Sequence, residues 1–268
     1  MPRTRLDQLM VARGLAENRS KAQALILAGV VRVDGEVQTR AGTPINEVSE
    51  ITVDAPLLYV SRGGYKLAHA LDSFGLDPAG CVALDIGAST GGFSDVLLQR
   101  GAALVYAVDV AYGVLDWRIR QHERVIPLER TNIRYLTELP PMDGSTADPV
   151  RAQCCSIDVS FISLRLVLPP LQPLIKPDAW IVALIKPQFE AGREQVGKGG
   201  VVRDSTVHRA VLREVLTAAA EMGLTPRGLT RSPLTGPAGN VEFLAWLQAS
   251  GTAQSPLAIA QAVQAVVS

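Results

Sequence analysis

The sequence is poor in cysteine, in aromatic residues and in long apolar runs, and it carries no excess of charge. Of 268 residues, three are cysteines and 5% are aromatic, while 26 Lys and Arg balance 26 Asp and Glu. Cys81, Cys154 and Cys155 have neither the spacing of metal ligands nor that of a redox pair. From the cysteines we expect a reduced protein without a metal site. Because the charges balance over the whole chain, any surface that binds nucleic acid must be local.

No segment is apolar for long enough to cross a membrane as a helix. The apolar run at 179–185 ends after seven residues at Lys186, whereas a spanning helix needs about twenty. The first residues, Met1 to Asp7, are charged and lack the apolar core of a secretory signal. We expect a cytoplasmic protein without membrane contacts, and with 47% hydrophobic residues it can bury a substantial core.

The apolar pattern divides the chain into a small N-terminal α+β domain at 1–55, a linker at 56–62 and a larger α/β domain at 63–268. The N-terminal domain is predicted to contain two short helices within 6–28, a hairpin around Asp34-Gly35 and a strand at 51–53. In the larger domain, strands alternate with helices, which predicts a Rossmann-like, mostly parallel sheet with an antiparallel hairpin at one edge. Strands are expected at 82–85, 104–108, 125–128, 154–159 and 180–185, helices at 65–74, 93–100, 115–122, 164–175, 207–222 and 257–267, the hairpin at 224–230 and 241–248, and loops at 140–149 and 190–202.

The segment 83–93 is the most informative part of the chain. An apolar strand leads to Asp85, Gly87 permits a tight turn, and Gly91-Gly92 let the backbone approach a ligand before a helix begins. This spacing departs from the G-x-G-x-x-G fingerprint and favours a cofactor without pyrophosphate. S-adenosyl-L-methionine fits, because its carboxylate can bind the free amides at a helix start. The expected cofactor-binding residues here are Asp85, Gly87, Ala88, Ser89, Thr90, Gly91 and Phe93.

Polar residues also follow the next two strands. Asp109 lies 24 residues after Asp85, where a carboxylate can accept hydrogen bonds from both ribose hydroxyls of an adenosine. Val110 beside it is a further expected cofactor contact. Asn132 follows the third strand and either approaches the adenine or only forms a turn.

Asp158 lies at the carboxyl end of the fourth expected strand and Lys186 directly after the fifth, at the edge where parallel sheets bind ligands. A lysine directly after a buried strand requires a partner, because burial disfavours its charged form. The two side chains therefore form either a structural salt bridge or part of a site beside the cofactor. Lys66 and Glu242 lie near the two ends of the larger domain, and their spacing alone does not bring them to this site.

Six segments match the motifs of one enzyme family, at 61–67, 85–93, 128–132, 158–164, 186–190 and 239–243. Together they resemble the TlyA family, a branch of the FtsJ-like ribosomal RNA methyltransferases, over essentially the whole chain. The resemblance implies a methyltransferase sheet that binds S-adenosyl-L-methionine and methylates a ribose 2′-hydroxyl of a cytidine. It also implies the catalytic tetrad Lys66, Asp158, Lys186 and Glu242. The linker residues 57–60 depart from the more basic, Trp-bearing connection of some members.

The N-terminal segments 5–7, 18–22, 26–29 and 31–35 resemble the alpha-L RNA-binding module of a small-subunit ribosomal protein, which TlyA proteins carry before their methyltransferase domain. Seven basic and four acidic residues give the first forty positions a charge of +3. The expected partner is structured ribosomal RNA within ribosomal subunits, held through its phosphates by a monomeric protein. The expected RNA-binding residues are Arg3, Arg5, Arg19, Lys21, Arg32 and Arg40.

Three other functions compete with this interpretation. A pseudouridine synthase can carry the same N-terminal module, but the Gly-rich turn and the alternation of strands and helices oppose it. A haemolysin or membrane-active protein is opposed by the lack of a spanning segment. A non-catalytic, cofactor-dependent RNA binder would lack tetrad groups, and all four are present. For Lys186 the sequence leaves open whether the amine removes a proton or, as a cation, orients the 2′-oxygen.

Overall fold

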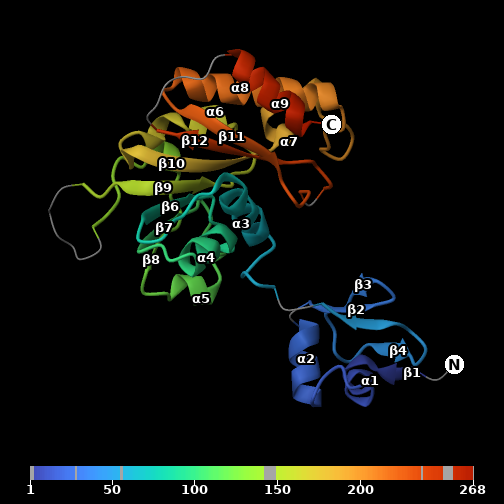
Figure 1. The fold of residues 1–268 in the computed structure, drawn as a ribbon. Coiled ribbons are helices and arrows are strands. Elements are labelled where there is room, and N and C mark those ends of the chain that lie inside the picture. The colour runs from blue at the N-terminus through green and yellow to red at the C-terminus, as the bar shows by residue number, and fades with distance from the viewer. Residues whose placement is uncertain are drawn as a thin grey trace. The chain divides into compact units, whose positions relative to one another are not determined.

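The computed structural model describes residues 3–27, 29–54, 57–141, 149–236, 238–249 and 256–267. It contains two compact units, Met1–Leu58 and Tyr59–Ser268 (Figure 1). The predicted domain end at residue 55 and linker start at residue 56 lie outside the described residues, as does most of the predicted loop at 140–149. These domain boundaries therefore stay predictions.

The N-terminal unit packs two helices on short strands. Its elements are β1 (Arg3–Arg5), α1 (Leu6–Ala12), α2 (Arg19–Leu27), β2 (Val31–Val33), β3 (Glu36–Val37), β4 (Pro44–Asn46) and β5 (Ile51–Val53). The two helices, the hairpin and the last strand lie where the sequence predicts them. The pairing of β1 with β4 was not predicted, because three-residue strands carry too little alternation to be recognised. Apolar side chains from the helices and strands, among them Leu6, Met10, Ile26 and Val31, form the core.

The larger unit is built on a seven-stranded sheet in the order β11-β12-β10-β9-β6-β7-β8. The strands are β6 (Val82–Ile86), β7 (Leu104–Val108), β8 (Val125–Leu128), β9 (Ala152–Ile157), β10 (Ile175–Ile185), β11 (Thr225–Arg231) and β12 (Phe243–Gln248). All pairs are parallel except those of β12, which runs antiparallel to both of its neighbours. The mostly parallel sheet with a hairpin at its edge confirms the predicted fold class.

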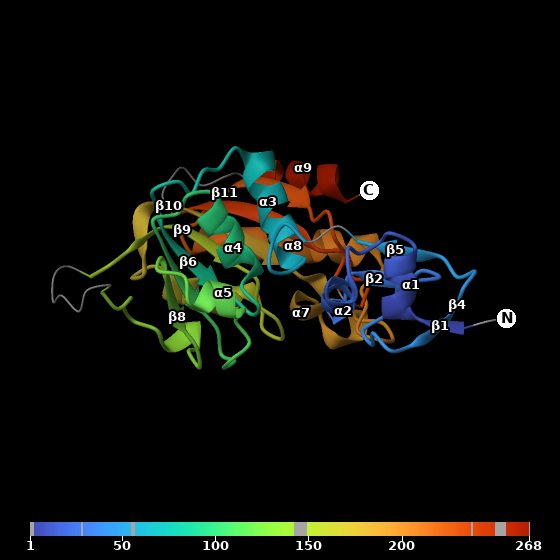
Figure 2. The same ribbon diagram turned by 90° about the horizontal axis from the view of Figure 1, so that it is seen from below.

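Helices cover both faces of this sheet (Figures 1 and 2). One face carries α3 (Gly63–Phe74), α4 (Gly92–Gln99) and α5 (Trp117–Arg120), and the other carries α6 (Leu164–Val167), α7 (Pro187–Glu190), α8 (Ser205–Glu221) and α9 (Pro256–Val266). Successive strand residues alternate between two cores, so that Ala83 packs with α3 and α4 whereas Leu84 packs with α8 and α9. Among the described helices, none is long and apolar enough to cross a membrane.

Two helix predictions and two strand predictions are wrong in extent. The helix predicted at 164–175 ends at Val167, because Pro169 and Pro170 cannot continue an α-helix, and a 3-10 turn, Pro169–Leu171, follows. Ile175 already begins β10, five residues before the start of the strand predicted at 180–185. The helix predicted at 115–122 is reduced to α5, and the strand predicted at 154–159 lies at Ala152–Ile157, so that Asp158 comes directly after it.

The order of strands reverses between β6 and β9, which places a crevice at their carboxyl ends. β7 and β8 extend the sheet on one side of β6, and the chain then crosses to β9 on the other side. In open α/β sheets, ligands bind in the crevice at such a reversal. The backbone N–H of Asp158 donates to the carbonyl of Ile86 at 2.8 Å, so the segments that follow β6 and β9 lie side by side.

Candidate active site

Two adjoining cavities open at this reversal point. The first has a volume of about 350 Å³ and lies among α3, the turn after β6, and the segments that follow β9 and β10. The second has a volume of about 420 Å³ and lies beside the ends of β6, β7 and β9. Both are lined by Gly87, Ser89, Asp158 and Ser160, so the two cavities adjoin at these residues.

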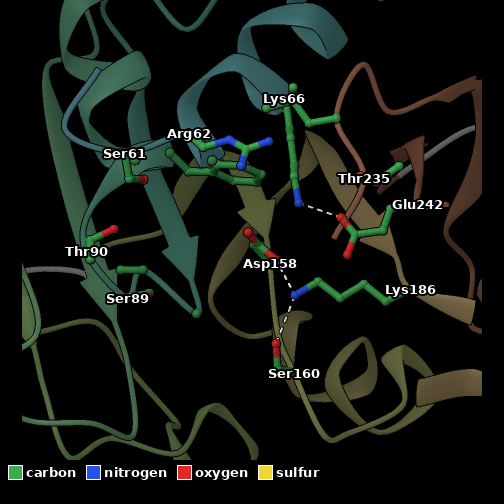
Figure 3. Close-up of a pocket in the computed structure, with 16 residues that line it drawn as sticks. Ser61, Arg62, Lys66, Ser89, Thr90, Asp158, Ser160, Lys186, Thr235 and Glu242 are labelled. Carbon is green, nitrogen blue, oxygen red and sulfur yellow. Dashed lines mark hydrogen bonds and ion pairs between the residues drawn. The ribbon is translucent and has the colours of Figure 1, made fainter. Parts of the chain in front are cut away.

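The first cavity brings together Lys66, Asp158, Lys186 and Glu242, which come from four separate segments (Figure 3). Nζ of Lys66 lies 2.5 Å from Oε2 of Glu242. Nζ of Lys186 lies 2.6 Å from Oδ1 of Asp158 and donates a hydrogen bond of 2.9 Å to Oγ of Ser160. The four residues that the resemblance grouped as a tetrad therefore form two lysine–carboxylate pairs in one cavity.

Three of these charges are withdrawn from water, whereas Asp158 is half-buried. The exposed fraction is 9% for Lys66, 9% for Lys186 and 1% for Glu242. A buried charge is costly unless it is paired, and each lysine here has one carboxylate partner. The contact of Lys186 with Asp158 lacks hydrogen-bond geometry, so the aligned hydrogen bond of this ammonium goes to Ser160.

The turn after β6 requires glycine at position 87. Gly87 has φ +79°, and a Cβ there would lie 2.4 Å from the carbonyl oxygen of Asp158. The next turn residue, Ser89, has φ +50° and donates its backbone N–H to Oδ2 of Asp109 at 2.7 Å. Oδ1 of Asp109 accepts the N–H of Ala111 at 2.8 Å. Asp109 thus joins the turns after β6 and β7, and its oxygens retain lone pairs for a ligand.

Most of the predicted cofactor residues line the cavities. Ala88, Thr90 and Phe93 line the first cavity, and Asp109, Val110 and Asn132 line the second. Oδ1 of Asn132 also accepts the backbone N–H of Arg134 at 3.1 Å, which caps a short 3-10 helix, Ile133–Tyr135. Asn132 therefore has the turn role that the sequence left open, and it also faces the cavity.

Asp85 and Gly91, which the sequence predicts to contact the cofactor, line neither of the two cavities. Because β6 continues to Ile86, the Asp85 side chain points toward α4 and is fully buried. Oδ2 accepts the hydroxyl of Ser94 at 2.6 Å, and Oδ1 accepts that of Ser156 at 2.8 Å. Burial raises the pKa of Asp85 to about 6, although these hydroxyls oppose the shift.

Gly91 instead precedes α4 with φ +92°, and a Cβ there would lie 2.9 Å from a Leu115 side-chain carbon. Its role is to let the turn pack closely against the segment that leads to α5.

Several residues of the cavities were not predicted as site residues. Ser61, Arg62 and Ser160 line the first cavity and lie inside the family motifs, so the motifs were the signal that could have identified them. Leu234 and Thr235 also line it, but they lie between two strands of the edge hairpin, where no sequence pattern marks them. Phe161 lines the second cavity, with 90% of its surface exposed.

The six predicted RNA-binding residues all lie in the N-terminal unit, where Arg32 is half-buried and the other five are exposed. Arg5 donates two hydrogen bonds to Asp7, of 3.0 and 2.9 Å, and Arg19 donates a third of 2.8 Å. Hydrogen bonds from Arg5 hold the pKa of the buried Asp7 carboxyl well below its ordinary value. Asp7 thus fixes two of the predicted RNA-binding side chains and offsets one of their charges.

Comparison with known proteins gives matches for both units. Residues 59–249 match the FtsJ-like methyltransferase family, and residues 4–51 match the S4 domain. The 16S/23S rRNA (cytidine-2′-O)-methyltransferase TlyA of Mycobacterium tuberculosis is 48% identical over 248 residues, which cover 92% of this chain and 90% of that protein. Hemolysin A of Brachyspira hyodysenteriae is 39% identical over 241 residues, or 90% of this chain and 98% of that protein.

A solved structure of a candidate hemolysin from Streptococcus thermophilus is 44% identical, with a TM-score of 0.73. The match covers 99% of this chain and 96% of the Streptococcus thermophilus chain. The sequence resemblance to this family is therefore confirmed by similarity along nearly the whole chain.

Proposed function

Because the chain belongs to the FtsJ-like methyltransferase family, we propose that it transfers a methyl group from S-adenosylmethionine to the ribose 2′-hydroxyl of a cytidine in ribosomal RNA. The observation that carries this proposal is the convergence of two lysine–carboxylate pairs in one cavity beside a glycine turn. The relatives named as rRNA cytidine-2′-O-methyltransferases support the choice of the acceptor.

The residues of the two cavities fit the proposed cofactor. Asp109 would accept the ribose hydroxyls of its adenosine in the second cavity, next to Val110 and Asn132. The turn from Gly87 to Thr90 would hold the amino-acid part, because glycine lets the backbone pass close to Asp158. When bound, S-adenosylmethionine supplies a methyl group that its sulfonium makes electrophilic.

The protein must hold the ribose hydroxyl in line and handle its proton. We assign the contact with the 2′-oxygen to Nζ of Lys186, which donates a hydrogen bond to Ser160 and is held in the cavity by the charge of Asp158. An ammonium at this point stabilises the negative charge that develops as the O–H bond breaks. Asp158, at 2.6 Å from the amine, is the nearest carboxylate to receive the proton.

Lys66 and Glu242 form the second wall of the acceptor site. Their pair lines the first cavity and not the second. We assign to Lys66 a contact with the ribose or its phosphate, with Glu242 keeping the ammonium in place at 2.5 Å.

The N-terminal unit would bind ribosomal RNA through its phosphates. The S4 domain match and the exposed basic residues Arg3, Lys21 and Arg40 support this role. Since phosphate contacts give affinity more than sequence choice, the cytidine would be selected by its place in the folded RNA. Action on ribosomal subunits would place the protein in the cytoplasm, and a monomer remains our expectation.

Incubation of the full chain with labelled S-adenosylmethionine and purified unmodified ribosomal subunits tests the proposal, with mass mapping of the RNA. We expect 2′-O-methylcytidine at one or a few positions. Lys186→Met should lower the transfer rate by about a hundredfold or more and leave cofactor binding within about twofold. Lys176→Met, which changes an exposed lysine near the start of β10, the strand that precedes Lys186, is the matched control and should keep the wild-type rate.

A methyl group on a base instead of a ribose would contradict the proposed reaction. A wild-type transfer rate for Lys186→Met would leave the reaction intact but remove the role assigned to this lysine.

A further inference from the structure

Glu190 is a buried carboxylate near the active site that the proposed reaction does not use. It lies at the end of α7 and is 8% exposed. Oε2 accepts the hydroxyl of Ser163 at 2.6 Å, and Oε1 accepts the backbone N–H of Leu164 at 2.7 Å. One side chain thus binds two consecutive residues at the start of α6, a segment 26 residues earlier in the chain.

The two segments that Glu190 connects carry three of the groups that form the active site. Residues 158–164 include Asp158 and Ser160, and residues 186–190 begin with Lys186. Apart from Glu190, the segments meet through the contacts of Lys186 with Asp158 and Ser160. They meet again between these points, where the rings of Phe161 and Phe189 lie 4.9 Å apart.

The first of these segments has a strained backbone. Phe161 has φ +63°, a conformation that large L-residues rarely adopt, yet 90% of its surface is exposed. Burial of its own side chain therefore does not maintain the turn, and its ends must be anchored. One anchor is the hydrogen bond from the N–H of Asp158 to Ile86, and the other is Glu190 at Ser163 and Leu164.

We propose that Glu190 is a positioning residue that holds the Phe161 turn and thereby keeps Ser160 and Asp158 against the amine of Lys186. The proposal rests on the function proposed above for that site. It assigns to Glu190 an effect on turnover without any contact with RNA or cofactor, since Glu190 lines neither cavity.

The hydrogen-bond pattern separates two substitutions at this position. In Glu190→Gln, the amide oxygen can still accept the N–H of Leu164, and the amide nitrogen can donate to the hydroxyl of Ser163. Burial raises the pKa of Glu190, so an uncharged group is tolerated there. Glu190→Ala removes both hydrogen bonds and leaves the Leu164 N–H without its acceptor.

A matched control is available on the neighbouring helix α8. Glu214 is an exposed acid, 3.9 Å from Arg165, which follows Leu164 in the same segment. Glu214→Gln changes the charge near α6 without touching the hydrogen bonds that hold the turn.

The experiment measures the acylation rate of Lys186 in the full chain without RNA, by mass spectrometry after brief exposure to an amine-reactive reagent. Glu190→Ala should raise this rate about fivefold or more, because the amine loses its contacts with Ser160 and Asp158. The kcat of methyl transfer should fall about tenfold or more while the Kd of S-adenosylmethionine stays within about twofold. Glu190→Gln and Glu214→Gln should both remain within about 1.3-fold of wild type.

Ser163→Ala removes the hydrogen bond between Ser163 and Glu190 and should raise the acylation rate of Lys186 about twofold. This variant replaces Glu190→Ala in the experiment if Glu190→Ala does not fold. A folded Glu190→Ala with wild-type acylation of Lys186 would overturn the inference, as would an unchanged rate in Ser163→Ala. If the wild-type protein methylates no RNA, the proposed function fails, but the acylation comparison still decides whether Glu190 positions Lys186.

Discussion

Replacing Asp85 by asparagine should stabilise the protein at neutral pH and leave cofactor binding intact. The carboxylate is fully buried, with its oxygens bound to the hydroxyls of Ser94 and Ser156 and away from both cavities. Asparagine has nearly the same shape and can exchange hydrogen bonds with two hydroxyls. The substitution therefore removes a buried charge and keeps the packing.

The size of the effect follows from the pKa. Burial raises the pKa of Asp85 to about 6 from its ordinary 3.8, so between these values the native state keeps a proton that the unfolded chain releases. Wild-type stability therefore falls as the pH rises through this window and is constant above it. At about 1.36 kcal/mol per pH unit, ionisation of Asp85 costs about 3 kcal/mol at pH 8. Roughly half of this cost is already present at pH 5.

Urea unfolding of wild type and Asp85→Asn at pH 5 and pH 8 checks this reasoning. The variant should be more stable at both, with a gain at pH 8 that is about twice the gain at pH 5. Asp178→Asn, at an exposed position, should show no such gain. Equal stability differences at the two pH values would refute the assigned cost of burial. A stable variant that has lost cofactor affinity would show that Asp85 contacts the cofactor after all.

Three further predictions concern the glycine turn, the proposed adenosine contact and the RNA surface. Gly87→Ala should abolish cofactor binding, measured by calorimetry, because the new Cβ would lie 2.4 Å from a backbone carbonyl oxygen. The control Gly80→Ala, at φ +70° in open space, should only lower the melting temperature by a few degrees. Asp109→Ala should weaken S-adenosylmethionine binding about tenfold or more, since the turns it joins lose two hydrogen bonds. The double change Lys21→Gln and Arg40→Gln should lower RNA affinity and flatten its salt dependence without altering cofactor affinity; an unchanged salt dependence would contradict phosphate binding.

The RNA test uses Lys21 and Arg40 because the structure changes what Arg5 and Arg19 can report. Both arginines bind the buried Asp7, which the sequence showed only as one of several acids near them. Neutralising Arg5 and Arg19 would leave that carboxylate without its cationic partners and destabilise the N-terminal unit. A loss of RNA affinity would then have two causes that the measurement could not separate.

The sequence predicts the sheet well because its strands are short apolar runs with clear ends. The predicted bounds of β7 and β8 agree with the structure, and each strand is followed by a polar residue or a turn. Asp85 shows where this reasoning fails. The strand was predicted to end at Asp85, but β6 extends one residue further, to Ile86. Successive side chains of a strand point to opposite faces, so a shift of one residue changes the face on which a side chain lies. The face on which the Asp85 side chain lies depends on how the neighbouring strands pair with β6, and a local sequence pattern does not predict that pairing.

Lys66 and Glu242 show a second limit. They are 176 positions apart, and neither has a local pattern that separates a catalytic charge from a surface charge. Only the family motifs grouped them. The physical cause of their meeting is tertiary, because α3 packs against β12, at whose start Glu242 lies. The position of β12 between β10 and β11 is likewise a property of the whole sheet.

The lining of the two cavities also indicates where the proposed reaction takes place. Asp158 and Ser160 line both cavities, whereas Lys66, Lys186 and Glu242 line only the first. If the second cavity holds the adenosine and the first holds the ribose, their reacting atoms meet at Asp158. Gly87 faces the backbone carbonyl of this residue, where any side chain would collide. The glycine that predicted a cofactor turn in the sequence therefore also lets the turn after β6 pack closely against the segment after β9, at the residues that the two cavities share. The turn pattern alone does not reveal this role.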